Sequence, residues 1–415
     1  MSRRFLGPAA LQVPNLGDPL YRWRRDYAKR KMRVINVGLM GDSIPYGQGA
    51  TVGTIPDRTN YPDTMTVQLQ RYLNEVPTFG QRNWIDDALG TATTYPRPTG
   101  GGQAVRASYC QSGGFADPWQ LVSGTVSKVS RGIGQQSLQL NAGARVGYTA
   151  EDCDGFLFWY ENGASQTGAL AATVYAGDYS ANPTAYYTNA GGAPVNTGLA
   201  QYTRSFVAWE LPRGKWTIEF TPASGTPVLD MLYALSGDLA RGVRVWNIAW
   251  GGTGSSDWSA NTTAANTAAS SANKLEGFET NRGLDLMIYY IGAGDYSGGV
   301  SGATFQANLE AAIDKYRAAQ TRTTLPFLLV SHFARYDNVS PTVPWSTYKN
   351  AMRTVTTTRT GVDYLDLEPW FPASQAADTD DDLVDSSGVH LTSQGQAVAA
   401  QQIAYKLMAP FGMAA

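Results

Sequence analysis

A serine and a histidine, distant in the chain, have the residue types needed for nucleophilic catalysis. Ser43 closes a Gly41-Asp42-Ser43 turn directly after a short apolar run. Such a serine can present its hydroxyl, and a neighbouring histidine can remove the hydroxyl proton. The chain has only two histidines, His332 and His390, so a general-base histidine must be one of them. His390 lies in a turn-rich segment before the last helical pattern, beside small and hydroxyl-bearing residues.

Other candidate residues also follow apolar runs. Gly252 comes after one run, Gly294 after the next, and His332 directly follows a third. Ligands of open α/β sheets bind at the carboxyl ends of the strands. Glycines at such ends let backbone N–H groups approach a developing oxyanion closely. We therefore expect one shared site, with Tyr296 as a possible substrate contact. His332 is a substrate contact, an alternative base or a structural histidine.

The elements that position these residues alternate between strands and helices. Apolar runs bounded by glycine predict buried parallel strands, and helical spacing follows each run. The expected strands are 34–40, 243–249, 286–291, 327–330 and 362–367, and helices are expected near 60–73, within 255–278, at 305–316, at 345–358 and at 399–407. This alternation predicts a doubly wound α/β sheet built from 34–99 and 237–415.

Residues 100–236 have a different pattern. Period-2 segments replace helical spacing, for example Trp216, Ile218 and Phe220 alternating with Thr217 and Glu219. Frequent turn residues separate these segments. The pattern predicts an antiparallel β-sandwich, inserted after the first strand–helix unit.

Composition narrows the function classes. The 415 residues carry a formal net charge of −2 and only 16% charged residues. That balance disfavours nucleic acid as a partner. No run approaches a membrane span, and the N-terminus lacks the apolar core of a signal peptide. Cys110 and Cys153 are not in a CxxC motif, which leaves free thiols or a disulfide open and gives no support for a metal site or cofactor.

The first 33 residues form a basic segment. They hold nine Lys and Arg and two Asp. Two alternatives fit this charge: a solvated arm and helix, or a docking segment for an acidic partner. We treat 1–33 as a basic N-terminal arm.

Four motifs together resemble the SGNH (GDSL) hydrolases. These are Gly41-Asp42-Ser43, Asn247 with Gly252, the segment from Gly292 to Asp295, and the segment from Gly388 to Gly395. The family comprises serine esterases and acylhydrolases with a flavodoxin-like, three-layer α/β/α fold. The resemblance covers about 34–95 and 237–410. It implies that Ser43 is the nucleophile, that His390 is the base, and that Ser43 and Gly252 supply oxyanion N–H groups.

Two positions depart from the family pattern. Gly294 stands where the family has an asparagine that donates to the oxyanion, and Ser387 stands where it has the aspartate that orients the histidine. Tyr296 or another donor could replace the missing asparagine at the oxyanion. Asp385, Ser387 or a main-chain carbonyl could replace the missing orienter, and we take Asp385 as the third catalytic residue, with Gly294 kept in the oxyanion set.

Two functions follow as hypotheses. The first is a serine esterase that removes acyl groups, such as acetyl, from a cell-surface polysaccharide or glycolipid. The second is a receptor-binding protein that kept the fold and lost catalysis. Inserted sandwiches of such esterases resemble carbohydrate-binding modules, and Tyr179, Tyr186, Tyr187 and Tyr202 are candidates for stacking on sugars.

The expected setting is a phage tail or the cell exterior. The absence of a recognisable signal peptide and the excess of Arg over Lys resemble tail proteins of phages that infect actinobacteria. In that setting the basic arm would contact other tail proteins. We also expect a homo-oligomer.

Overall fold

The computed structural model describes most of the chain between residues 17 and 408. The stretches outside the description are 1–16, 31, 48, 51–63, 75–102, 107–118, 130–136, 163–168, 178–184, 189–194, 197–202, 236–241, 250, 261–283, 319–323, 338–339, 379–381 and 409–415. Cys110, Tyr179 and Tyr202 fall on these stretches, so the predictions for the disulfide and for two of the four tyrosines lie outside the described residues.

Within the described residues, five parallel strands form the central sheet. They are β1 (Val34–Gly41), β12 (Gly242–Asn247), β13 (Leu286–Tyr290), β14 (Phe327–Ser331) and β15 (Val362–Asp366). Their spatial order is β12-β1-β13-β14-β15, and every pairing is parallel. The first strand in the chain therefore lies between the second and the third, so the order reverses at β1. The predicted α/β fold with a parallel sheet is confirmed.

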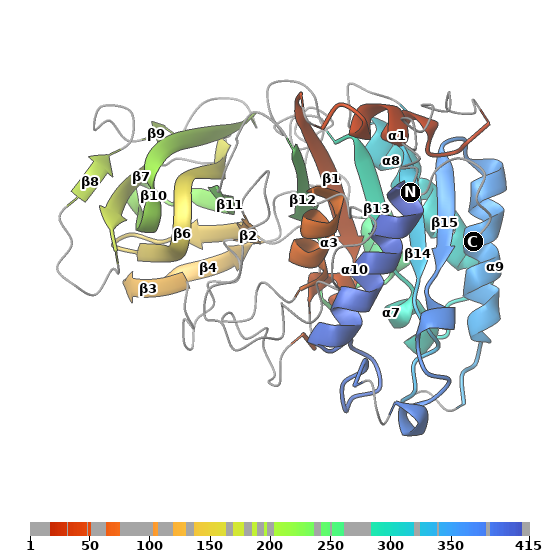
Figure 1. The fold of residues 1–415 in the computed structure, drawn as a ribbon. Coiled ribbons are helices and arrows are strands. Elements are labelled where there is room, and N and C mark those ends of the chain that lie inside the picture. Colours follow the sequence, from red (N-terminus) through yellow and green to blue (C-terminus); the bar gives the residue numbers. More distant parts are fainter. Residues whose placement is uncertain are drawn as a thin grey trace, which may run out of the picture.

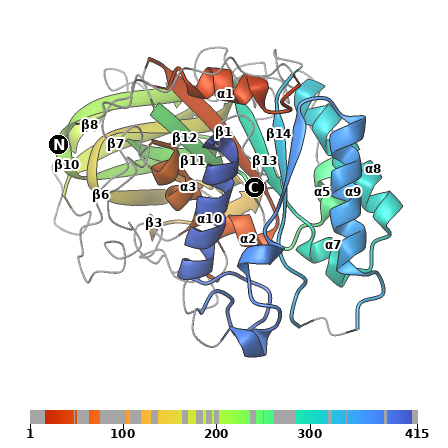
Figure 2. The same cartoon turned by 45° about the vertical axis from the view of Figure 1, so that its right-hand side comes forward.

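Helices cover both faces of this sheet (Figures 1 and 2). The helices are α1 (Tyr21–Tyr27), α2 (Ser43–Tyr46), α3 (Met65–Asn74), α5 (Ser255–Ala260), α7 (Ala293–Ser297), α8 (Gly302–Ala318), α9 (Trp345–Thr358) and α10 (Ser393–Met408), with 3₁₀ turns η4 (Glu368–Trp370) and η5 (Gln375–Ala377). Figure 2 shows α3 and α10 on one side of the sheet and α5, α8 and α9 on the other. None of the helices in the described part of the chain is long and apolar enough to span a membrane.

Alternation along each strand builds two cores. On β13, Met287 and Tyr289 pack in the core beneath α8 and α9, while Leu286, Ile288 and Tyr290 pack in the core beneath α3 and α10. Successive side chains of a strand point to opposite faces, so a strand that is covered on both faces must be apolar throughout. This is why the central strands appear in the sequence as unbroken apolar runs.

The end of the basic segment is not a free arm. Trp23 on α1 is fully buried, and its indole N–H donates to the Leu407 carbonyl on α10 at 3.2 Å. Asp26 is also buried and lies within 3.8 Å of Lys29 and 3.5 Å of Arg33. Residues 17–30 and 32–33 are therefore part of the α/β domain, contrary to the expected arm. The charge count could not show this, because it carries no information on which side chains of the segment are buried.

The insert lies between α3 and β12. Its strands are β2 (Gln103–Arg106), β3 (Trp119–Ser123), β4 (Val126–Val129), β5 (Ser137–Leu140), β6 (Arg145–Asn162), β7 (Ala169–Ala176), β8 (Ala185–Thr188), β9 (Val195–Asn196), β10 (Thr203–Ser224) and β11 (Val228–Leu235). All their described pairings are antiparallel and join them in one sheet, as the sequence predicted for strand direction. The long strands β6 and β10 pair with each other in the middle of the sheet, with register shifts between Glu210 and Trp216. In Figure 1 this sheet lies beside the β12 edge of the parallel sheet.

One strand of the insert is more buried than expected. Trp216, Ile218 and Phe220 are buried, but the alternating Thr217 and Glu219 are also only 0% and 5% exposed. Arg145 pairs with Glu219 at 2.9 Å, and Thr217 donates to the Gly177 carbonyl at 2.8 Å. The alternation of residue types therefore does not separate a buried side from an exposed one here, because polar partners cover the polar side.

Candidate active site

Ser43 lies at the point where β1 passes into α2. Gly41, directly before this turn, has φ +145°, and a Cβ there would lie 1.7 Å from the Tyr290 carbonyl oxygen. Only glycine fits between the two adjacent strands. Asp42 caps α2 by accepting from the Ile44 N–H at 3.0 Å, which makes Ser43 the first residue of that helix. The local sequence thus holds the serine in a tight strand-to-helix turn.

Asp42 also connects two strand ends. Its second carboxylate oxygen accepts from the Ala293 N–H at 3.2 Å, at the start of α7 after β13. The side chain is buried, and burial raises the pKa of the Asp42 carboxyl to about 7, against the lowering effect of the two N–H groups. Asp42 therefore fixes the serine turn relative to the next strand.

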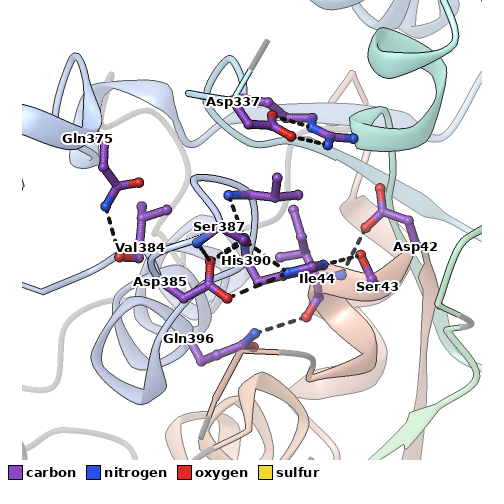
Figure 3. A network of polar contacts seen from close by, with 12 residues as sticks. Asp42, Ser43, Ile44, Asp337, Gln375, Val384, Asp385, Ser387, His390 and Gln396 are labelled. Carbon is purple, nitrogen blue, oxygen red and sulfur yellow. Dashed lines mark hydrogen bonds and ion pairs between the residues drawn. The ribbon is translucent and has the colours of Figure 1, made fainter. Parts of the chain in front are cut away.

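His390 lies opposite Ser43 (Figure 3). Its Nε2 is 3.0 Å from the Ser43 Oγ, although the two residues are 347 positions apart. A compact loop carries the histidine: the Asp385 N–H donates to the His390 carbonyl at 2.9 Å, and the Gly388 N–H donates to the Asp385 carbonyl at 2.9 Å. This distance lets His390 accept the serine proton.

Two side chains stand behind the histidine ring. His390 Nδ1 is 3.3 Å from the Ser387 Oγ and 3.6 Å from Asp385 Oδ2. The Ser387 hydroxyl in turn donates to Asp385 Oδ1. Burial acts to raise the pKa of the Asp385 carboxyl, but hydrogen bonds from His390 and Ser387 outweigh it and lower the pKa below its usual value. Asp385 thus stays ionised beside the imidazole.

The glycines expected at the oxyanion occupy different surroundings. Gly252 has φ +79°, and no atom lies within 4 Å of the position that its Cβ would occupy. A Cβ on Gly294, by contrast, would lie 2.8 Å from the Thr253 carbonyl oxygen. An asparagine therefore cannot replace Gly294 without movement of the backbone. Tyr296 is 4% exposed, with its ring against Trp345 and Tyr348.

His332 is not in contact with solvent. The ring is fully buried and stacks against Phe333 and Trp345, with Tyr290 at its edge. Neither ring nitrogen has a hydrogen-bond partner among the described residues. Burial lowers the pKa of His332 to about 3, so the ring stays neutral. The expected substrate contact is wrong for this conformation, because aromatic rings enclose the histidine.

Two buried amides support the serine turn. Asn247 donates to the Pro45 carbonyl at 3.1 Å. Gln396 on α10 donates to the Ile44 carbonyl at 3.0 Å and accepts from the Met65 N–H at 3.1 Å. Gln396 was missed from the sequence, although it lies six residues after His390. The described residues include no cluster of three or more His, Cys, Asp or Glu side chains that could hold a metal ion.

Residues 219–398 match the GDSL-like Lipase/Acylhydrolase family. The match covers less than half of the chain. It includes Gly252, Gly294 and His390 but leaves out β1 and Ser43. The matched segment is therefore similar to GDSL-like lipases and acylhydrolases, and the parallel sheet is of the α/β type. A comparison with curated proteins finds no match.

Solved structures show a distant likeness. A family two carbohydrate esterase from Cellvibrio japonicus aligns at 12% identity over 74% of this chain and 98% of its own, with a TM-score of 0.27. A family two carbohydrate esterase from Clostridium thermocellum, in complex with cellohexaose, aligns at 11% identity over 65% and 94%, with a TM-score of 0.28. The salicylyl-acyltransferase SsfX3 from a tetracycline biosynthetic pathway aligns at 12% identity over 75% and 98%, with a TM-score of 0.28. These scores carry no conclusion about substrate.

Proposed function

We propose that this protein is a serine ester hydrolase in which Ser43 is the nucleophile and His390 the general base. One observation carries the proposal: the 3.0 Å approach of His390 Nε2 to the Ser43 Oγ at the carboxyl ends of parallel strands. The GDSL-like family match over 219–398 agrees with this chemistry.

The reaction has two halves. In the first, Ser43 Oγ attacks the ester carbonyl carbon while His390 Nε2 takes the hydroxyl proton. The C–O bond to the alcohol then breaks, and His390 returns the proton to the departing oxygen. In the second half, His390 takes a proton from water, the hydroxide attacks the acyl-enzyme, and Ser43 leaves with that proton. The products are a carboxylic acid and an alcohol, with no net proton held by the enzyme.

Asp385 orients the base in this proposal, directly and through Ser387. With a proton on Nδ1, His390 donates to the Ser387 Oγ, and the Ser387 hydroxyl donates to Asp385. Asp385 Oδ2 also faces Nδ1 at 3.6 Å. The ionised carboxylate therefore stabilises the imidazolium that forms when Ser43 is deprotonated. In this proposal Asp385 and Ser387 together orient His390, which the family does with an aspartate at the position of Ser387.

The oxyanion is bound by main-chain groups. The proposed donors are the N–H groups of Ser43 and Gly252, with Gly294 beside them. Loss of one oxyanion donor costs roughly 10²–10³ in rate in serine proteases. Because Gly294 supplies no side-chain amide, we expect a turnover that is slow for this chemistry.

Substitution of the nucleophile tests the proposal. Wild-type protein should hydrolyse p-nitrophenyl acetate, and Ser43→Ala should lose that activity. Ser386 is exposed and lies on the turn that carries His390, so Ser386→Ala is the matched control and should keep the activity. A fluorophosphonate should add its mass to the wild type at Ser43 only. Equal rates for wild type and Ser43→Ala would overturn the proposal.

The proposed natural substrate is an acylated cell-surface glycan, and the insert is the proposed glycan-binding unit. Burial on β7 alternates, with Leu170, Ala172 and Val174 inside, which agrees with a sheet that covers a core on one face. We propose that its two halves pack as a jelly-roll-like sandwich across the irregular segment of β10. Binding of acetylated xylan is measured for the intact protein and for a variant that lacks residues 100–236. Equal binding by the two would refute this role.

A receptor-binding protein that has lost catalysis is the second candidate. The observation that favours it is the absence of a side-chain amide at Gly294. In this alternative the protein binds the host surface, and neither wild type nor Ser43→Ala releases acetate from isolated envelopes. Equal envelope binding by the two, without any acetate release, would support it over the hydrolase.

We also propose a virion setting, in which exposed charges on α1 and in the turn after it contact other tail proteins. Arg25 and Lys29 are half exposed, at 50% and 51% of their side chains. The double change Arg25→Glu and Lys29→Glu should reduce incorporation into particles while leaving the buried Trp23 in place. Unchanged incorporation would refute this contact, and absence of the chain from purified particles would refute the setting.

A further inference from the structure

An ion pair stands beside the proposed active site. Arg335 and Asp337 lie on the loop after β14, and the pair is bidentate: Nε donates to Asp337 Oδ1 at 2.9 Å and a terminal nitrogen to Oδ2 at 2.6 Å. The other terminal nitrogen donates to the Ala293 carbonyl at 3.3 Å. The side chains remain 17% and 39% exposed. No step of the proposed reaction uses them.

Main-chain contacts fix this loop against both sides of the site. The Tyr336 N–H donates to the Gly388 carbonyl at 2.9 Å, on the turn that carries His390. Gly388 has φ +71°, and a Cβ there would lie 3.1 Å from the Asp337 nitrogen. Ala293, which accepts from Arg335, donates its own N–H to Asp42 beside Ser43. Figure 3 shows Asp337 on one side of the Ser43 and His390 pair.

The pair retains unused hydrogen-bonding capacity. A guanidinium has five N–H donors, and the described residues accept from three of those of Arg335. Each Asp337 oxygen accepts one of these bonds and has a further lone pair.

We propose that Arg335 and Asp337 form a subsite for the alcohol part of the ester, and that this alcohol is a neutral polyol such as a sugar. The inference rests on the proposed hydrolase function. Unused N–H groups of Arg335 donate to one sugar hydroxyl oxygen, and Asp337 accepts from a neighbouring hydroxyl. Arg335 is thereby a specificity-determining residue.

Charge selects a neutral ligand over an anionic one. The bidentate carboxylate already neutralises the guanidinium, and Asp385 adds negative charge on the turn whose Gly388 carbonyl accepts from the Tyr336 N–H. Removing water from a carboxylate-bearing substrate would cost more free energy than its contact with this neutral pair would gain. Hydroxyl groups both donate and accept, which matches one donor group next to one acceptor group.

The test compares two ester substrates. Methyl glucoside monoacetate presents free hydroxyls to the subsite, whereas p-nitrophenyl acetate presents none. Arg335→Gln and Asp337→Asn should lower kcat/KM for the sugar ester roughly 10- to 100-fold, mainly through KM, as expected for the loss of a charged hydrogen-bond partner. The kcat/KM for p-nitrophenyl acetate should fall much less, so the ratio of the two kcat/KM values is the readout.

A second bidentate pair provides the matched control. Arg359 donates to Asp314 through Nε at 3.1 Å and a terminal nitrogen at 2.9 Å, between α8 and the end of α9. Arg359→Gln should leave the ratio of the two kcat/KM values unchanged. If Arg335→Gln lowers kcat/KM equally for both substrates, or for neither, the proposed subsite is refuted.

A binding measurement separates this inference from the proposed function. Ser43→Ala is titrated with methyl glucoside monoacetate by calorimetry, alone and combined with Arg335→Gln. Weaker binding in the double variant supports the subsite even if no hydrolysis is found. Equal binding by the two refutes it, even if Ser43 is shown to be the nucleophile.

Discussion

Ionisation of Asp42 should make the stability of this protein depend on pH in an unusual direction. The carboxyl is 2% exposed, and burial raises its pKa to about 7. The Ile44 and Ala293 N–H groups and the charge of His390 lower the pKa, while Asp295 raises it further. The ordinary value is 3.8, so the folded protein binds this proton more tightly than the unfolded chain does.

The sign and size of the effect follow from linkage. A raised pKa in the folded state contributes stability that is fully present below the unfolded pKa and is lost as pH rises through about 7. A shift of about three units, at about 1.36 kcal/mol each, gives about 4 kcal/mol in total. Between pH 5 and pH 8 about two of these units are crossed, which corresponds to about 3 kcal/mol.

Asp42→Asn isolates this contribution. Asparagine keeps an oxygen that can cap α2 but cannot ionise. Urea unfolding of wild type and variant from pH 5 to pH 8 should show the stability advantage of the wild type falling by about 3 kcal/mol as pH rises. Asp314→Asn, on the exposed side of α8, controls for the loss of a surface charge. A difference between wild type and Asp42→Asn that stays constant across this range would refute the reasoning.

Three further changes have defined outcomes. Gly294→Asn should lower ester hydrolysis and the melting temperature rather than restore a family donor, because its Cβ would meet the Thr253 carbonyl at 2.8 Å; a faster enzyme would contradict this. His332→Phe should stabilise the protein by about 2 kcal/mol more at pH 5 than at pH 8, since the pKa of the buried ring is lowered to about 3 and its stability contribution is lost as pH falls from about 6.5. Urea unfolding at the two pH values measures that change, and equal effects would oppose it. Trp23→Ala should cost about 3–5 kcal/mol in unfolding free energy; a loss below about 1 kcal/mol would show that α1 is dispensable.

Local patterns were sufficient for much of the fold. The helix expected at 345–358 has those bounds, and the five expected strands end within two residues of the observed ones. Apolar runs are informative because parallel strands covered on both faces need apolar residues at every position. The helix expected within 255–278 is described only as α5, up to Ala260.

Local sequence patterns do not predict the surroundings of the two histidines. Both follow strand or turn signals, and the sequence could not place one at a partly exposed site and the other in the core. Rings from other segments of the chain, above all Trp345 on α9, enclose His332. His390 instead meets Ser43 from 347 positions away. The resemblance of the flanking motif favoured His390, but only packing distinguishes the two environments.

The sequence by itself determined the alternation of strands and helices, the place of the insert and the small set of side chains that can do acyl chemistry. These properties depend on neighbours along the chain, through side-chain periodicity and turn residues. The tertiary structure decided that α1 packs on α10, that Ser387 connects His390 to Asp385, and that Arg335 and Asp337 stand beside the site. Each of these contacts depends on loop geometry or on surfaces brought together from distant segments, and no local pattern encodes such distances.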